Sequence, residues 1–337
     1  MLEKPDLPDD RLKSCLHDDY GLRITELSFL PLGADVDTAV YRAVSEDGRS
    51  YFVKLRRGEF DDTAVLVPQL LSELGIRQII APIPTIAGQP WTQVDAFTVV
   101  LSPFVEGESG FDRQLSDQQW IALGVALRRM HAAELPRSLT EQLPGETYSS
   151  HWRDLVRTFQ ARVERDVFDD PAAAQLATLL RANEDTVSRL VDRAGQLGET
   201  LRGRPLDQVL CHGDIHAGNV LIDENHALYI VDWDTLSMAP KERDLMFVGA
   251  GIGNVWNSLR EEALFYQGYG PTDVDSMALA YYRYERIVQD VAAFCEQLLS
   301  TDEGGEDREQ SLRYFASQFL PGSVIDIAFQ SDQSSMP

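Results

Sequence analysis

The chain has 337 residues with 54 Asp and Glu against 30 Lys and Arg, so its formal net charge at pH 7 is −24. This acidity and the lack of a basic block argue against binding to nucleic acid or to an anionic membrane surface, which both require cationic surface. Apolar residues make up 44% of the chain, as is typical of a folded globular protein. Residues 201–337 hold 22 acidic and 9 basic side chains, and either solvated surface or an acidic site for a cationic ligand accounts for this excess.

Cysteine usage and the N-terminus bear on the compartment. Cys15, Cys211 and Cys295 are widely spaced and odd in number, so a reducing compartment is favoured over a disulfide framework. The acidic N-terminus lacks the apolar core of a signal peptide, and no run approaches the ~18 apolar residues of a membrane span. These features predict a cytoplasmic protein.

The first hundred residues predict a small, mostly antiparallel sheet with one main helix. Asp9 and Asp10 can cap a short first helix that ends near Gly21. A second helix is expected between Asp61 and Gly75. The expected strands are Ile24–Leu30, Ala39–Ser45, Ser50–Leu55, Trp91–Val94 and Phe97–Phe104.

From Ser116 onward the pattern becomes helical. Ser116 and Gln119 have the spacing of a capping box, and apolar residues then recur at helical spacing. The boundary between the sheet-rich first part and the helical second part falls near residues 106–110. Further helices are expected at Ser150–Asp166, Pro171–Leu201, Arg260–Tyr269, Asp273–Leu299 and Glu306–Phe319.

A short β-type segment interrupts the helices and concentrates chemically capable side chains. Its apolar runs, Val209–Cys211, Val220–Ile222 and Leu228–Val231, place the intervening polar residues on loops at the ends of buried strands. Buried strands hold such loops rigidly, which suits catalysis. The polar residues of these loops are His212, Asp214, His216, Asn219, Asp232 and Asp234.

Three chemistries fit this segment less well. The spacing of His212 and His216 suits zinc on a helix, but the flanking glycines and strands indicate a loop. Ser/His/Asp hydrolysis is disfavoured because no G-x-S-x-G elbow occurs. The glycines of residues 249–253 lack the preceding strand of a dinucleotide-binding loop, so they indicate helix termination or close packing.

Phosphoryl transfer fits best, because it needs a carboxylate to orient the attacking hydroxyl, oxygen ligands for magnesium and a cation on the phosphates. Asp214 supplies the carboxylate, and Asn219 and Asp232 supply the oxygen ligands. Lys54 is the candidate cation, since it alone among the four lysines lies inside an apolar strand. Taken by itself, Lys54 is more typical of an edge or solvent-facing strand residue, and the downstream cluster of polar residues favours the functional role.

Three segments together resemble one known family. CHGDIHAGN (211–219) is similar to the catalytic loop of the aminoglycoside phosphotransferase family, IVDWD (230–234) to its metal-binding segment, and PKERDL (240–245) to the region that follows. The resemblance extends over nearly the whole chain and implies an α+β, protein-kinase-like fold with two lobes. The smaller lobe, an antiparallel sheet with one main helix, would be residues 1–105 with a hinge near 102–105. The larger, mostly helical lobe would be residues 106–337.

The resemblance also implies roles for individual residues. Asp214 would be the catalytic base, and Asn219 and Asp232 would hold Mg²⁺. Lys54 would contact the phosphates of ATP or GTP. Kinase-like enzymes usually pair this lysine with a helix glutamate, but Val67 stands near that position here, so the sequence does not identify the acid that pairs with Lys54. The other nucleotide-binding residues would be Gly33, Ala34 and Asp35 of the phosphate-covering loop at 32–38, and Ser102, Phe104 and Val105 of the hinge.

The acceptor site is expected beside the base. Asp234 is a candidate for binding a cationic acceptor, and Trp256 is another, although a core role fits Trp256 equally well. His212 and Asp244 would brace the catalytic loop. The implied reaction is phosphorylation of a hydroxyl on an aminocyclitol or aminoglycoside antibiotic, with spectinomycin as the expected acceptor. A kinase of the same fold for a choline- or thioribose-like metabolite, and a non-catalytic nucleotide-binding module, are the alternatives.

Overall fold

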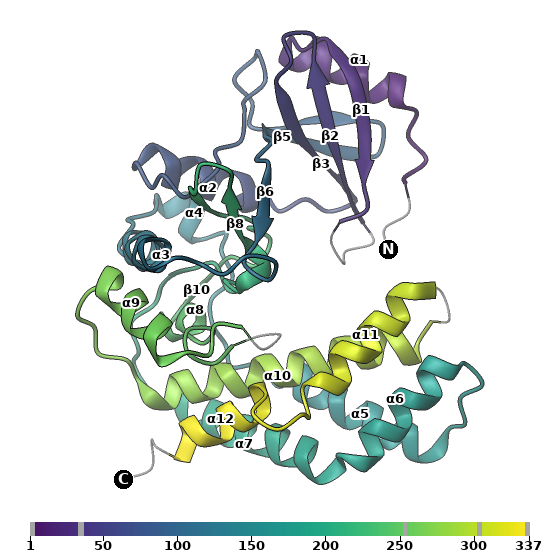
Figure 1. Cartoon of the computed structure of the whole chain (residues 1–337), viewed down its shortest axis with the longest axis vertical. Helices are drawn as coiled ribbons and strands as arrows, with labels where there is room; N and C mark the ends of the chain where they lie inside the picture. Colours follow the sequence, from purple (N-terminus) through teal and green to yellow (C-terminus); the bar gives the residue numbers. More distant parts are fainter. Residues whose placement is uncertain (1–3, 33–36, 252–254, 302–304, 334–337) are drawn as a thin grey trace. The chain divides into compact units, whose positions relative to one another are not determined.

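The structure, a computed structural model, describes residues 4–32, 37–251, 255–301 and 305–333 (Figure 1). The chain divides into two compact units, each of which is described by itself. The first unit comprises residues 1–115, 133–143 and 218–236, and the second comprises residues 116–132, 144–217 and 237–337. Among the described residues, no helix has both the length and the apolar character needed to cross a membrane.

A five-stranded antiparallel sheet dominates the first unit and confirms the sheet that the sequence predicts (Figure 1). Its strand order is β1-β2-β3-β5-β4, so β3 is central and pairs with both β2 and β5. The strands are β1 (Ile24–Leu30), β2 (Thr38–Ser45), β3 (Ser50–Arg57), β4 (Thr92–Val94) and β5 (Phe97–Pro103), and the helices of this part are α1 (Asp9–Tyr20) and α2 (Thr63–Glu73).

The alternation of side chains along β3 determines how Lys54 is presented. Tyr51, Val53 and Leu55 are buried in the hydrophobic core that the sheet shares with α1. Phe52 and Lys54 belong to the opposite face, because successive side chains of a strand point to opposite sides, and both are half-buried. The strand therefore offers the ammonium group of Lys54 on the face away from this core.

The start of α1 differs from the prediction. Pro8 is the N-cap, and the structure shows no side-chain cap there, so Asp9 and Asp10 lie in the first turn instead. Their negative charge is favourable in that position because the helix dipole is positive at its N-terminus. The predicted end of the helix is correct, since Gly21 adopts a left-handed conformation with φ of 71°.

The remainder of the first unit is a second, three-stranded sheet with the order β6-β8-β9. Gly107 of β6 lies so close to β8 that a Cβ atom there would stand 2.7 Å from the carbonyl oxygen of Ile222. The β-bridge between Ile79 and Ile230 also ties this sheet to the segment after α2. The elements are β6 (Gly107–Ser109), α4 (Arg137–Thr140), β8 (Val220–Asp223) and β9 (Leu228–Ile230).

The second unit is mostly helical, as predicted. The capping box of Ser116 and Gln119 is present at the start of α3. One predicted helix is wrong in extent, because Asn183 separates residues 171–201 into two helices. The helices are α3 (Asp117–His131), α5 (His151–Arg165), α6 (Pro171–Ala182), α7 (Glu184–Arg202), α8 (Glu242–Leu245), α9 (Leu259–Tyr269), α10 (Ser276–Leu299), α11 (Gly305–Ser317) and α12 (Val324–Gln333), and β7 (Val209–Cys211) pairs with β10 (Ser237–Ala239).

Helices α3 and α9 approach each other closely through glycine. A Cβ atom at Gly124 of α3 would stand 2.1 Å from the carbonyl oxygen of Phe265. A Cβ atom at Gly268 of α9 would stand 2.0 Å from the carbonyl oxygen of Ile121. These two positions therefore admit no side chain without separation of the helices.

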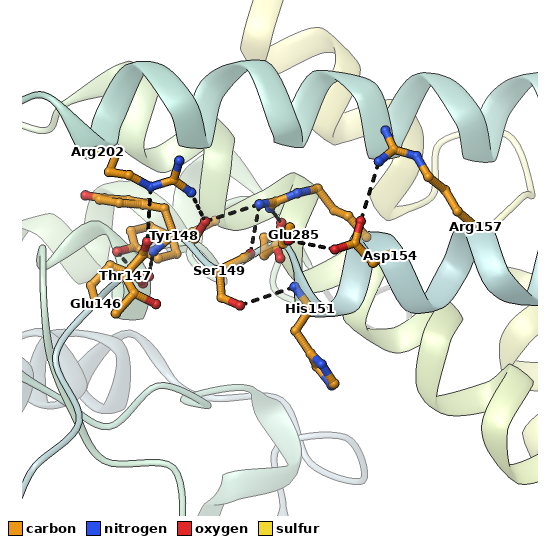
Figure 2. Close-up of polar contacts among 12 residues, drawn as sticks. Glu146, Thr147, Tyr148, Ser149, His151, Asp154, Arg157, Arg202 and Glu285 are labelled. Carbon is orange, nitrogen blue, oxygen red and sulfur yellow. Dashed lines mark hydrogen bonds and ion pairs between the residues drawn. The ribbon is translucent and has the colours of Figure 1, made fainter.

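Arginine side chains tie the segment before α5 to α7 and α10 (Figure 2). Arg153 of α5 donates to the carbonyl oxygens of Tyr148 and Ser149, at 3.2 and 2.8 Å, and also pairs with Glu285 of α10. Arg202 of α7 donates to the same Tyr148 oxygen at 2.9 Å. Because Arg153 is only 4% exposed, these contacts fix the register of α10 against its neighbours.

Candidate active site

The first unit supplies an acid partner for Lys54. Its Nζ lies 2.5 Å from Oδ2 of Asp234, which is 180 residues later in the chain. The partner therefore comes from the segment after β9 and not from the helix α2, where Val67 is fully buried. The sequence contains no local signal for this pairing, because the two residues meet only through the fold.

Asn219 and Asp232 lie on neighbouring segments of the same unit. The backbone N–H of Val231 donates to the carbonyl oxygen of Asn219 at 3.0 Å, so Asp232 follows directly after this contact. Asp232 has a φ of 66°, a left-handed conformation that non-glycine residues rarely adopt and that is common at functional sites. Asn219 carries an amide and Asp232 an exposed carboxylate, and both groups contain oxygen atoms of the kind that Mg²⁺ prefers as ligands.

The predicted hinge residues follow the central sheet. Ser102 is within β5, and the backbone N–H of Phe104 donates to the carbonyl oxygen of Ser50 at 3.1 Å. The ring of Phe104 has the guanidinium carbon of Arg42 5.2 Å above its centre, and Val105 is half-buried beside it in the chain. The predicted phosphate-covering residues Gly33, Ala34 and Asp35 lie outside the described residues.

A buried carboxylate braces the predicted catalytic loop in the second unit. Asp244 accepts hydrogen bonds from the backbone N–H groups of His212, at 3.0 Å, and Gly213, at 2.7 Å, which confirms its predicted bracing role. Nε2 of His131 lies 3.0 Å from the same carboxylate, and Nδ1 of His131 lies 2.7 Å from the hydroxyl of Tyr269. Burial would raise the pKa of Asp244, but hydrogen bonding and the charge of His131 hold it below its ordinary value.

His212 supports the same loop from within. It is fully buried, and its Nδ1 accepts a hydrogen bond from the backbone N–H of Asp214 at 3.3 Å. The structural role predicted for this histidine is therefore confirmed. His131, by contrast, was not predictable, because a lone histidine in an apolar helix carries no motif.

Asp214 itself is half-buried and has two charged neighbours. Its Oδ1 lies 2.5 Å from Nη1 of Arg286 on α10, and its Oδ2 lies 3.6 Å from Nε2 of His216. Burial would raise the pKa of Asp214, but the contact with His216 and the charge of Arg286 outweigh it and hold this pKa well below its ordinary range. The carboxylate is thus ionised across the physiological range.

The arrangement of histidines does not favour zinc. Among the described residues, the one group of three potential metal ligands is His131, Cys211 and Asp244, which includes neither His212 nor His216. Both ring nitrogens of His131 already have hydrogen-bonding partners, and burial raises the pKa of the Cys211 thiol well above its ordinary value. This group is therefore best described as the brace of the catalytic loop.

The predicted acceptor residues have different environments. Asp234 is exposed and pairs with Lys54 in the first unit. Trp256 belongs to the second unit, where it is 3% exposed and its ring packs edge-on against Trp120 at 4.9 Å. The structure therefore brings Lys54, Asn219, Asp232 and Asp234 into the first unit and Asp214 and Trp256 into the second, and the chain passes between the units at residues 217–218.

Comparison with known proteins decides the family. The sequence pattern of the phosphotransferase enzyme family matches residues 28–280, which include all the described site residues named above except Arg286. The chain belongs to this phosphotransferase family. It is 30% identical over 253 residues to protein StrN of Streptomyces griseus, covering 72% of this chain and 75% of StrN.

The structure of this phosphotransferase is also similar to solved structures. It matches spectinomycin phosphotransferase APH(9)-Ia in complex with ADP and spectinomycin with a TM-score of 0.91 and 40% identity, over 98% of this chain and all of the other. Choline kinase LicA of Streptococcus pneumoniae matches with a TM-score of 0.53 and 16% identity over 92% of this chain and 99% of its own, which shows a shared fold alone. The fold is therefore the protein-kinase-like fold of the aminoglycoside phosphotransferases, and the enzyme is a kinase that acts on hydroxyl groups.

Proposed function

We propose that this kinase transfers the γ-phosphate of a nucleoside triphosphate to a hydroxyl group of spectinomycin, an aminocyclitol antibiotic. The observation that carries this proposal is the full-length similarity to spectinomycin phosphotransferase, because it extends through the helical unit as well as the phosphate-transfer motifs. The biological consequence would be resistance to the antibiotic.

The nucleotide would bind to residues 1–105. Lys54 supplies a cation on the face of β3 away from the core, where it can contact phosphate oxygens. Residues 32–38 would cover the phosphates. The hinge residues Ser102, Phe104 and Val105 would contact the nucleobase through backbone groups. Complexes of the similar spectinomycin phosphotransferase with ADP and with AMP support this role for a nucleotide.

Magnesium would be held by Asn219 and Asp232. Both offer oxygen ligands, and the strained conformation of Asp232 directs an exposed carboxylate from the end of β9. When bound, the ion would neutralise negative charge on the phosphates.

Asp214 would orient the acceptor hydroxyl and take its proton. A lowered pKa makes it a weak base, but phosphoryl transfer passes through a loose transition state in which orientation matters more than base strength. The charge of the ionised carboxylate would also attract a cationic acceptor. Residues 106–337 would hold this acceptor, with Asp234 as a candidate contact. Trp256 is only 3% exposed and packs against Trp120, so it fits the core role instead.

A metabolite kinase is the second candidate function. The phosphate-transfer residues do not touch the acceptor, so they are compatible with a choline- or thioribose-like substrate, and choline kinase shares the fold. A non-catalytic nucleotide-binding module is disfavoured because Lys54, Asp214, Asn219 and Asp232 are all present.

An acceptor panel separates these functions. Purified protein is incubated with Mg²⁺ and ATP, and ADP release is measured with spectinomycin, other aminocyclitols, choline and a thioribose. Spectinomycin should stimulate release most, and Asp214→Asn should reduce that release by orders of magnitude. Glu224→Gln, an exposed acid on the same segment, should behave like the wild type. If choline stimulated ADP release most, choline would take the place of spectinomycin as the proposed acceptor. If no acceptor stimulated ADP release, the non-catalytic nucleotide-binding module would be favoured.

A further inference from the structure

Arg286 engages one oxygen of the proposed base. Its Nη1 lies 2.5 Å from Oδ1 of Asp214, and the two residues are 72 positions apart in the chain. The other oxygen, Oδ2, lies on the side of His216, at 3.6 Å from its Nε2. The two oxygens of the carboxylate are therefore not equivalent, because one is bound by a charged donor at short range.

Arg286 is itself held in place. Its Nε lies 3.0 Å from Oδ1 of Asp290, one helical turn further along α10, and its guanidinium carbon lies 5.5 Å from the centre of the Phe247 ring. The side chain is 19% exposed. The ion pair with Asp290 and the Phe247 ring limit the movement of the guanidinium, so its contact with Oδ1 limits the positions that the Asp214 carboxylate can take.

Charge makes this contact stronger than a surface ion pair. Asp214 and Arg286 are both 19% exposed, so solvent screens their attraction less than it would at the surface. The charged and titratable groups around Asp214 within the second unit are Arg286 and Asp290 from α10, and His212 and His216 from the loop. Removal of Arg286 would leave the two carboxylates, Asp214 and Asp290, without the cation that separates them.

We propose that Arg286 is a positioning residue for Asp214: it binds Oδ1 and holds the carboxylate so that Oδ2 is the oxygen that receives the acceptor hydroxyl. Asp290 and Phe247 hold the guanidinium in turn. This inference rests on the proposed function in that Asp214 must act on an acceptor hydroxyl. It adds a residue of α10 that lies outside the motifs and beyond the residues that match the family pattern.

A double-mutant cycle tests the inference. Arg286→Met in the wild-type background should lower kcat about 100-fold, because misplacing a reacting group by about 1 Å has an effect of this order, while KM for spectinomycin should change little. In the Asp214→Asn background, the same substitution should lower the residual kcat less than about twofold, since a residue that acts through Asp214 has nothing left to position. Arg286→Lys should be intermediate, because it keeps the charge but loses the planar fork.

Arg283→Met is the matched control. Arg283 is on the same helix and donates to the carbonyl oxygens of Met246 and Val248, so its loss tests a general weakening of α10. It should lower kcat by the same factor in both backgrounds. The inference would be overturned if Arg286→Met lowered kcat by the same factor in the wild-type and Asp214→Asn backgrounds, or if the single variant kept the wild-type kcat. If Arg286→Met does not fold, as judged by circular dichroism, the Arg286→Lys cycle decides by the same criterion.

The outcome also distinguishes this inference from the proposed function. A wild-type chain that phosphorylates another acceptor refutes spectinomycin as the substrate, and the cycle is then run with that acceptor. A chain that phosphorylates no acceptor in the panel overturns both.

Discussion

The ion pair between Lys54 and Asp234 is the residue-scale feature with the most direct functional consequence. The two side chains are 25% and 40% exposed, so the pair contributes at most about 1 kcal/mol to stability. Its importance is positional, because it fixes the ammonium group that would bind phosphate. Asp234 could therefore orient Lys54 or bind the cationic acceptor. The KM values for ATP and for spectinomycin distinguish these two roles.

Asp234→Asn should act mainly on the nucleotide. We expect KM for ATP to rise about tenfold, because Lys54 loses the carboxylate that holds it, while KM for spectinomycin stays within about twofold. Steady-state kinetics with each substrate varied in turn checks this. Asp47→Asn is the control, since Asp47 pairs with Arg49 at 3.4 Å on an exposed turn. A change confined to KM for spectinomycin would instead assign Asp234 to the acceptor.

The residues of the candidate site differ in how far the sequence predicts them. Asp214, Asn219 and Asp232 lie close together in the chain, with fixed spacing, so a motif identifies them. Asp234 lies 180 positions from its partner Lys54, and Arg286 lies 72 positions from its neighbour Asp214. No local pattern encodes such contacts, because only the packing of the elements produces them.

At the scale of elements, local signals predict most of the fold. The period-2 alternation predicts the strands of the first sheet, and the capping box predicts the start of α3. The break between α6 and α7 was missed because the residues on both sides of Asn183 keep a helical pattern. The short strands β6 and β10 were also missed, since neither has the apolar run that identifies the equally short β7 and β9.

The glycine contact between α3 and α9 yields an element-scale prediction. Gly268→Ala should destabilise the protein by about 1–3 kcal/mol, because its methyl group would overlap the backbone at Ile121. Gly195→Ala in α7 is the matched control, since nothing lies within 4 Å of its added Cβ and alanine is the better helix former, so stability should rise by up to about 1 kcal/mol. Chemical denaturation measures both. Equal effects of the two substitutions would contradict the close approach.

At the scale of the whole molecule, the charge of −24 affects association with a cationic acceptor. Attraction between opposite charges raises the association rate and is screened by salt. Raising the ionic strength from about 0.02 to about 0.5 M should therefore lower kcat/KM for spectinomycin several-fold, with kcat itself nearly constant. Initial rates at low spectinomycin concentration measure this effect. A kcat/KM that does not respond to salt would mean that the acidic surface does not assist capture.

Transfer of labelled phosphate shows whether this kinase phosphorylates spectinomycin. The protein is incubated with Mg²⁺, spectinomycin and ATP labelled in the γ-phosphate, and the products are separated and identified by mass spectrometry. We predict one labelled phosphate on spectinomycin for each ADP formed, with the product reduced by orders of magnitude in Asp214→Asn. Formation of ADP without phosphorylated spectinomycin would show that spectinomycin is not the acceptor, and equal product from the Asp214→Asn protein would show that Asp214 is not the catalytic base.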